Sequence, residues 1–276
     1  MEKTTRRTLF ALLTTVTALG SAPAAAEGIN DNYWFEAEAF WPKVDTNIEV
    51  SSVTNNTVGT NIDFEKDLDY NNSKTLPAFA IGARITNSFR VEAEYYSLGR
   101  KSSTTLARDI EFDDVLYKTG ADVRSKFDSS VYRFTVGYSF YRKPNAEIGA
   151  SLGLHATDFL ISLEGQGTVN GVTSQIEARR KKVLAPLPTL GLYGSFEVAP
   201  RFVLGGNVDW LKLKVGDYDG RLLNFEAKAS YRVMKNVALG VMYRSVDYRV
   251  DVEKPEWVGS LRYKFHGPAV FLHAGF

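Results

Sequence analysis

The amino-acid sequence predicts an all-β protein that folds as a closed antiparallel transmembrane β-barrel of about ten strands. Long segments alternate apolar and polar side chains with a period of two residues, as strands do. Short turns alternate along the chain with longer polar segments, which is the connection pattern of membrane barrels. After the first residues, no run of about 18 apolar side chains could form a transmembrane helix.

The composition argues against several classes of function. The 276 residues carry a formal net charge of +1, which argues against a nucleic-acid binder with its basic stripe. The same balance does not mark a protein that binds anionic surfaces by charge alone. The chain has no cysteine, so disulfides, thiolate nucleophiles and thiolate metal sites are excluded. No cofactor is expected.

The first residues, MEKTTRRTLFALLTTVTALGSAPAAAEG, have the three parts of a secretory signal. Lys3, Arg6 and Arg7 form a positive end, an apolar stretch follows, and small residues precede Ala26. We expect cleavage after Ala26, so that residues 1–26 are the signal peptide and 27–276 are the barrel. The twin arginines leave the twin-arginine export route as an alternative. The general secretory route is favoured because a barrel reaches its membrane unfolded.

Two segments show the alternation most clearly. In 222–233, apolar side chains share one face of the expected strand, and Asn, Glu, Lys, Ser and Arg share the other. In 131–141, Tyr, Phe and Val alternate with Arg, Thr, Gly and Ser. A soluble β-sandwich also alternates. Here the polar faces are rich in charged and small residues, and aromatic rings occur near strand ends, as expected for a polar lumen and aromatic girdles.

Four tight turns set the number of strands. They are Thr86-Asn87-Ser88, Lys143-Pro144-Asn145, Ala199-Pro200-Arg201 and Met234-Lys235-Asn236. The longer polar segments between them are 43–75, 101–126, 164–182, 216–220 and 251–256. Short connections lie in the periplasm. Four of them, together with two periplasmic termini, give ten strands.

The expected strands are 32–41, 76–85, 89–100, 128–141, 147–163, 183–198, 202–213, 222–233, 237–250 and 257–276. The last contains His266-Gly267-Pro268, and a proline there requires a bulge or a break because it cannot donate to the ladder. A break there, together with one further crossing near 60–68, would give twelve strands. Eight and twelve strands therefore stay as alternatives.

The carboxyl terminus resembles the assembly signal of bacterial outer-membrane barrels. Phe276 is the final residue and shares a face with Val270, Leu272 and Ala274, where many barrels have an aromatic residue at the position of Ala274. More broadly, the chain resembles a little-characterised class of proteobacterial outer-membrane barrel proteins. The segments that carry this likeness are GTNIDFEKDLDY, LPAFAIGARITNSFRVEAEYY, YRFTVGYSF, AEIGASLGLHATDF, APLPTLGLYGSFEVAPRF and FHGPAVFLHAGF.

This resemblance implies a fold and a location but no reaction. It implies an outer-membrane protein of the Gram-negative cell envelope, in contact with outer-membrane lipid and lipopolysaccharide. It also implies that the barrel-assembly machinery reads Phe276. We expect a monomer that binds no nucleic acid.

Candidate catalytic residues are few. The three histidines, His155, His266 and His273, lie on separate segments and lack metal-ligand spacing. His155 shares a face with Ser151, but four residues of strand separate them by about 13 Å, too far for a direct bond. The acidic series Asp63, Glu65, Asp67 and Asp69 lacks the glycine and the terminal glutamate of a calcium loop, and its alternation suggests an exposed edge. We therefore expect no metal site and no enzyme. The alternative is an envelope hydrolase, acting on lipid A or peptides, built around His155.

Charged residues on the polar faces are the remaining candidates. In a barrel of about ten strands the interior is narrow, so charges there must pair. Such a network would form an ion-paired plug, or else line a narrow conduit for small solutes; the plug is favoured. The function expected is a structural, envelope or surface-interaction role. The residues expected in the lumen are Arg84, Arg90, Glu92, Glu94, Arg133, Glu147, Glu226, Lys228, Arg232, Arg244 and Arg262.

Overall fold

The computed structural model describes residues 29–52, 59–169, 171–255 and 257–276. The expected signal peptide and its cleavage site lie outside these described residues. Among them, no helix is both long enough and apolar enough to cross a membrane.

One antiparallel sheet holds the fourteen strands of the described chain. The only helix among these residues, α1, spans Phe64–Asp67. The strands are β1 (Tyr33–Phe40), β2 (Lys43–Ser52), β3 (Ile62–Asp63), β4 (Leu76–Arg84), β5 (Phe89–Thr105), β6 (Ile110–Phe112), β7 (Val115–Tyr117), β8 (Asp122–Lys143), β9 (Ala146–Val169), β10 (Val172–Ala199), β11 (Phe202–Val215), β12 (Tyr218–Met234), β13 (Val237–Glu253) and β14 (Trp257–Gly275).

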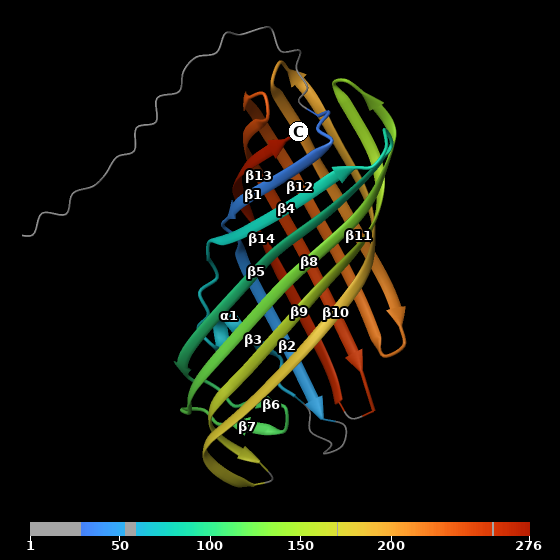
Figure 1. The fold of residues 1–276 in the computed structure, drawn as a ribbon. Helices are drawn as coiled ribbons and strands as arrows, with labels where there is room; N and C mark the ends of the chain where they lie inside the picture. Colours follow the sequence, from blue (N-terminus) through green and yellow to red (C-terminus); the bar gives the residue numbers. More distant parts are fainter. Residues whose placement is uncertain (1–28, 53–58, 170, 256) are drawn as a thin grey trace, which may run out of the picture.

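Ten of these strands close into a ring. The order around it is β1-β4-β5-β8-β9-β10-β11-β12-β13-β14, and β14 pairs back onto β1 (Figure 1). The closed antiparallel barrel that the sequence predicts is confirmed. The sheet contains more strands than the expected ten because β2, β3, β6 and β7 lie in segments that the sequence suggested were loops.

The four expected turns join β4 to β5, β8 to β9, β10 to β11 and β12 to β13. They lie at the end of the barrel where the last strand also ends (Figure 1). One contact between them is a hydrogen bond from the side-chain amide of Asn236 to the backbone carbonyl of Gly275. We call this the turn end and the opposite end the distal end. The carbonyl of Phe276 accepts hydrogen bonds from the amides of Asn32 and Tyr33 at 2.6 and 3.0 Å, which joins the first strand to the last.

The expected loops at the distal end are largely strand. β8, β9 and β10 contain 22, 24 and 28 residues, well beyond the length needed to cross a membrane. The ladder between β5 and β8 continues as far as the pair Thr105 and Asp122, so most of the segment 101–126 that was expected to be a loop is strand or short hairpin. The ladder continues because inward-facing apolar side chains pack into a core there.

The expected bulge or break at His266-Gly267-Pro268 is absent. β14 keeps one register with β13 along its whole length, and its register with β1 continues unchanged into β2. The interruption lies in the partner strand, at Trp41 and Pro42, between β1 and β2. The Trp41 amide donates to the Pro268 carbonyl at 3.0 Å, so the ladder keeps this bond although Pro268 has no N–H of its own.

The outer wall near the turn end is apolar and rich in aromatic residues. Phe, Tyr, Leu and Val side chains point outward there while charged and small polar side chains point inward, as predicted for 131–141 and 222–233. We call this surface the apolar belt. Its largest exposed members include Phe35, Phe79, Ile81, Phe134, Tyr138, Leu152, Leu192, Leu204, Trp210, Leu223, Phe225, Leu239, Tyr243 and Leu272.

The distal half has the opposite polarity. Its interior is a packed apolar core in which Phe127, Phe159 and Tyr263 contact one another, with ring centroids 5.4 to 6.1 Å apart. Outside, Arg262 and Lys264 point into solvent. Above the belt the wall therefore resembles that of a soluble barrel, with apolar residues inside and charged residues outside.

Two insertions pack onto this core at the distal end. Phe64 of α1 is fully buried against Phe127, with ring centroids 5.5 Å apart, and β6 and β7 bury Phe112 and Tyr117 (Figure 1). The Asp63 series is not the exposed alternating edge that the sequence suggested. Asp63 caps α1 by accepting the Lys66 amide, because carboxylates satisfy free amides at helix starts.

Candidate functional site in the barrel lumen

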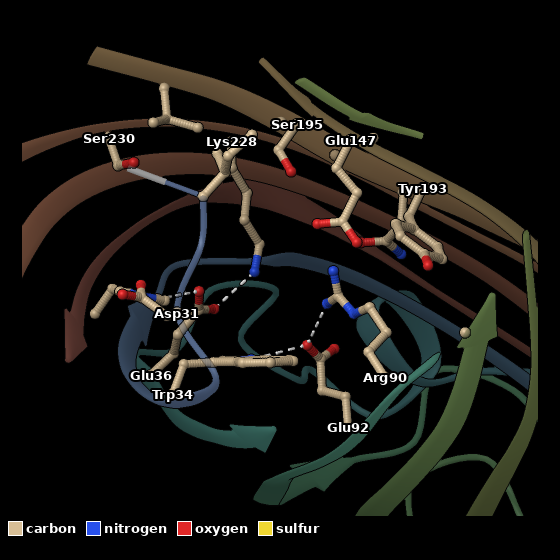
Figure 2. Close-up of a pocket in the computed structure, with 18 of the residues that line it drawn as sticks. Asp31, Trp34, Glu36, Arg90, Glu92, Glu147, Tyr193, Ser195, Lys228 and Ser230 are labelled. Atoms are coloured by element: carbon tan, nitrogen blue, oxygen red, sulfur yellow. Dashed lines mark hydrogen bonds and ion pairs between the residues drawn. The ribbon is translucent and has the colours of Figure 1, made fainter. Parts of the chain in front are cut away.

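The lumen contains a polar cavity of about 170 Å³ near the turn end. Residues from all ten strands of the ring line it, together with Arg201 of a short turn. Figure 2 shows the labelled residues converging on it from several walls. Because successive strand residues alternate between the two faces, mainly every second residue of a strand reaches this space. On β10 and β11, where glycines occur, consecutive residues line it.

Two ion pairs bridge strands that are distant in sequence. Arg84 of β4 makes two hydrogen bonds of 2.9 Å to the Glu147 carboxylate of β9, a bidentate pair buried from solvent. Lys228 of β12 donates to Glu36 of β1 across 2.7 Å (Figure 2). Each pair neutralises a charge that the narrow lumen would otherwise leave poorly solvated.

Arg90 lies between two aromatic rings. Its guanidinium is 4.8 Å from the Trp34 ring and 4.7 Å from the Tyr193 ring, and it pairs with Glu92 at 3.0 Å (Figure 2). The Trp34 indole also donates to Glu92 at 3.1 Å. Gly82 leaves space for Trp34, because a Cβ at Gly82 would lie 2.0 Å from the indole. The arginine is thereby fixed by cation–π contacts and by charge.

A second network crosses the barrel on the distal side of the cavity, which Arg133 of this network also lines. Arg133 pairs with Asp209 at 2.8 Å and with Glu94 at 3.3 Å. Arg244 is only 1% exposed and faces Glu38, Glu94 and Glu226. We call this set of six residues the deep network. It joins β1, β5, β8, β11, β12 and β13.

A third group, Asp31, Arg232 and His273, lines the mouth of the cavity. Arg232 donates to Asp31 at 2.6 Å, and the two His273 ring nitrogens lie 2.9 Å from Asp31 and 3.0 Å from Glu36. Because Asp31 precedes β1 and His273 lies in β14, these contacts hold the two ends of the chain together.

The distal core begins where the deep network ends. Phe40 and Tyr96 lie 5.7 and 5.2 Å from the Arg244 guanidinium and contact Phe265 on the core side. All three rings are buried members of the core cluster. The cavity therefore ends on a charged layer that is backed by packed apolar side chains.

Ten of the eleven charged residues predicted for the lumen face the interior and form ion pairs there; Arg262 is the exception. Arg262 is exposed on the outer wall, opposite Asn47 of β2. The prediction for Arg262 was wrong because it assigned every polar face to the lumen, whereas polarity reverses above the belt. Lumen-facing acidic residues that the sequence analysis missed are Asp31, Glu36, Glu38 and Asp209. Alternation with Phe35, Ala37 and Ala39 in β1 could have identified Glu36 and Glu38.

The histidines are dispersed. His155 is buried in the interior opposite Arg133, with its ring 6.2 Å from that of Tyr248. His266 faces outward, and His273 belongs to the group at the mouth. The burial of His155 keeps its ring away from any substrate at the barrel surface. This buried position gives no support to the hydrolase alternative built around His155.

No group of three or more potential metal ligands occurs within the described part of the chain. The acidic residues around α1 are bound separately by two arginines, Glu65 by Arg100 of β5 and Asp67 by Arg108 of the loop between β5 and β6. Burial alone would raise the pKa of Asp67, but hydrogen bonds from Arg108 and the Asp63 amide lower it below its ordinary value.

The structure resembles solved bacterial outer-membrane barrels. The outer membrane protease OmpT from Escherichia coli superimposes with a TM-score of 0.59 at 12% identity, covering 88% of this chain and 97% of OmpT. The Pseudomonas putida toluene transporter TodX gives a TM-score of 0.35 at 11% identity, covering 89% and 90% of the two chains. Neisserial surface protein A gives 0.24 at 16% identity, covering 91% and 99%. Of these three, the likeness to OmpT bears on the fold.

Neither a protein-family model nor a curated protein matches the sequence. The likeness to OmpT and the apolar belt agree on location. A closed barrel with outward apolar side chains and no open sheet edge is the form in which strands cross a bilayer. The chain is an outer-membrane β-barrel.

Proposed function

We propose that this barrel does not conduct solutes and serves as a membrane-anchored structural and surface-interaction protein. The observation that carries the proposal is the closure of the lumen. Arg244 and three glutamates cross the barrel at mid-height, and Phe40, Tyr96 and the distal core lie immediately beyond them. A hydrated ion would have to displace both layers to pass.

The closed lumen supports the ion-paired plug over the narrow conduit. The charges are paired across strands, so the network holds opposite walls together. The long distal strands would then raise a stiff platform above the membrane, with α1, β6 and β7 at its end. Such a platform fits a role in surface interaction without catalysis.

The expected partners form part of this proposal. Phe276 is 68% exposed on the outer wall at the turn end, where an assembly machine in the periplasm could contact it. The apolar belt would contact outer-membrane lipid and lipopolysaccharide. We further propose membership of the little-characterised proteobacterial barrel class and a monomeric state.

Planar-bilayer recordings test the closed lumen. The refolded full-length mature protein, checked for folding by its heat-dependent gel mobility, should insert without discrete conductance steps. A general porin added to the same bilayers confirms that steps can be detected. Reproducible steps from the wild-type barrel, scaling with salt concentration, would show that solutes pass and would overturn the proposal.

A further inference from the structure

Four cationic side chains form one row across the outer wall of β11, β12, β13 and β14. Lys212 is paired in register with Arg221, Arg221 with Arg249, and Arg249 with Arg262. Directly opposed residues in antiparallel strands point to the same face, and all four point outward. With strands about 4.8 Å apart, the row is about 14 Å long. We call it the cationic row.

Such a row is unfavourable by itself, because like charges directly opposite in neighbouring strands repel. Within the described residues, Arg249 pairs with Asp251 at 2.8 Å, and no ion pair is found for Lys212, Arg221 or Arg262. Other cations on the outer wall have carboxylate partners, for example Lys264 with Asp247 at 3.1 Å. The row is therefore a local excess of positive charge, whereas other cations on the outer wall are paired with carboxylates.

The row begins at the distal edge of the apolar belt, at Lys212 and Arg221. On β14 the exposed Lys264 and His266 lie between Arg262 and the belt, so the row extends away from the membrane boundary toward Arg262. Next to Lys212 and Arg221, toward the turn end, lie the register partners Trp210 and Leu223, which are 43% and 46% exposed. On β11 the belt runs from Phe202 to Trp210, nine residues, which is the length that a tilted strand needs to cross the hydrocarbon. Cations directly above exposed apolar side chains match a lipid whose acyl chains lie below an anionic headgroup.

The membrane leaflet follows from the position of the turns. Short turns of outer-membrane barrels face the periplasm, so the distal edge of the belt faces the outer leaflet (Figure 1). The outer leaflet consists of lipopolysaccharide, whose lipid A carries phosphates on a sugar backbone above its acyl chains. Arginine binds phosphate through two parallel hydrogen bonds, and three of the four cations are arginines.

We propose that the cationic row is a binding site for the phosphorylated headgroup of one lipid A molecule. Arg221 and Arg262 bind its phosphates, Lys212 adds charge at the membrane boundary, and Trp210 and Leu223 contact its acyl chains. Arg249 is held in place by Asp251. This site rests on the location in the outer membrane and is independent of whether the lumen conducts.

Titration of the detergent-solubilised full mature barrel with bisphosphorylated lipid A tests the site. The row variant combines Lys212→Gln, Arg221→Gln and Arg262→Gln. Its control, with Lys143→Gln, Arg201→Gln and Lys235→Gln, loses the same three charges from exposed positions at the turn end. We expect the row variant to bind at least about tenfold more weakly, because several charge-assisted hydrogen bonds are lost. The control should bind as the wild type does.

Two further probes identify the source of binding. Dephosphorylated lipid A should bind the wild type and the row variant equally weakly, and inorganic phosphate should not compete at comparable concentration. A further variant keeps the native Lys212 and carries Arg221→Lys and Arg262→Lys. Because it retains all the positive charges, it should bind lipid A more tightly than the row variant. The proposal is wrong if the row variant binds lipid A like the wild type, if phosphate removal from lipid A has no effect, or if inorganic phosphate binds as tightly.

Discussion

At the scale of single residues, Arg244 provides the sharpest test of the deep network. Its replacement by methionine would keep much of the side-chain volume but would leave Glu38, Glu94 and Glu226 buried beside one another without their shared cation. Breaking a buried pair in this way costs about 3–5 kcal/mol, because uncompensated charge stays in a poorly solvated site. We expect Arg244→Met to lower the free energy of unfolding in urea by about that amount.

The matched control for Arg244 lies on the same strand. Arg249 also pairs with a carboxylate, Asp251, but the pair is solvent-exposed, and exposed pairs contribute about 0–1 kcal/mol. Arg249→Met, measured in detergent without lipopolysaccharide, should therefore change the free energy of unfolding by less than about 1 kcal/mol. Equal effects of the two substitutions would show that the deep network does not stabilise the barrel.

Individual lumen residues were largely predictable because strand alternation places every second residue on one face. This succeeded for Arg133 and Glu226, which face the lumen on strands whose opposite face belongs to the apolar belt. It failed for Arg262, because alternation identifies a face but not whether that face meets lipid, lumen or water. The pairing partners were not predictable, because Asp209 meets Arg133 only once the barrel closes.

At the scale of elements, α1 and its cap illustrate the difference between pattern and structure. The Asp63 series alternates like a strand, yet only Asp63 of the four lies in β3, and a one-turn helix follows. The helix forms because Asp63 supplies the cap and because Phe64 and Leu68 are buried in the distal core. Tertiary burial thus decides the conformation of a segment whose local pattern allows either.

The same element should respond to acid. The pKa of Asp67 is lowered in the folded state, so its contacts stabilise the segment above the unfolded-state pKa of about 4 and are lost as pH falls below it. Amide hydrogen exchange in 62–69, corrected for its intrinsic pH dependence, should be slow at neutral pH and accelerate below about pH 4. Asp67→Asn should show faster exchange at neutral pH already.

Asp109→Asn is the control for this experiment. Asp109 has its pKa lowered to about 2 by hydrogen bonds from Lys118 and Thr119. It directly follows Arg108 in the chain, but the hydrogen bonds of its carboxylate go to Lys118 and Thr119 and not to α1 or to the Arg108 guanidinium. Its substitution should leave exchange in 62–69 unchanged. If amides 62–69 exchange as slowly in Asp67→Asn as in the wild type at neutral pH, the Asp67–Arg108 pair does not stabilise this segment.

At the scale of the whole molecule, the barrel consists of two zones stacked along one continuous sheet. The zone near the turn end has lipid outside and charge inside, and the distal zone has water outside and an apolar core inside. The change of polarity along β5, β8, β9 and β10 explains why the sequence seemed to contain long polar loops at 101–126 and 164–182. The outward charged residues of the distal strands resemble loop residues in the sequence. Only the structure shows that the residues between them face an apolar core.

This arrangement predicts which end of the barrel faces the cell exterior. The chain has no native cysteine, so single cysteines report position without background. Asp217→Cys lies exposed in the distal hairpin between β11 and β12, and Lys235→Cys lies exposed in the short turn between β12 and β13. In intact cells, a membrane-impermeant maleimide should label Asp217→Cys and leave Lys235→Cys unlabelled until the outer membrane is permeabilised.

Labelling after permeabilisation serves as the control for accessibility, since both positions are exposed in the folded barrel. The reverse pattern, with Lys235→Cys labelled in intact cells, would place the short turns outside. The cationic row would then face the inner leaflet, where lipid A is absent, and the proposed headgroup site would lose its ligand. Orientation therefore links the outer-wall site to the topology of the whole barrel, because the leaflet that the row meets is set by which end carries the turns.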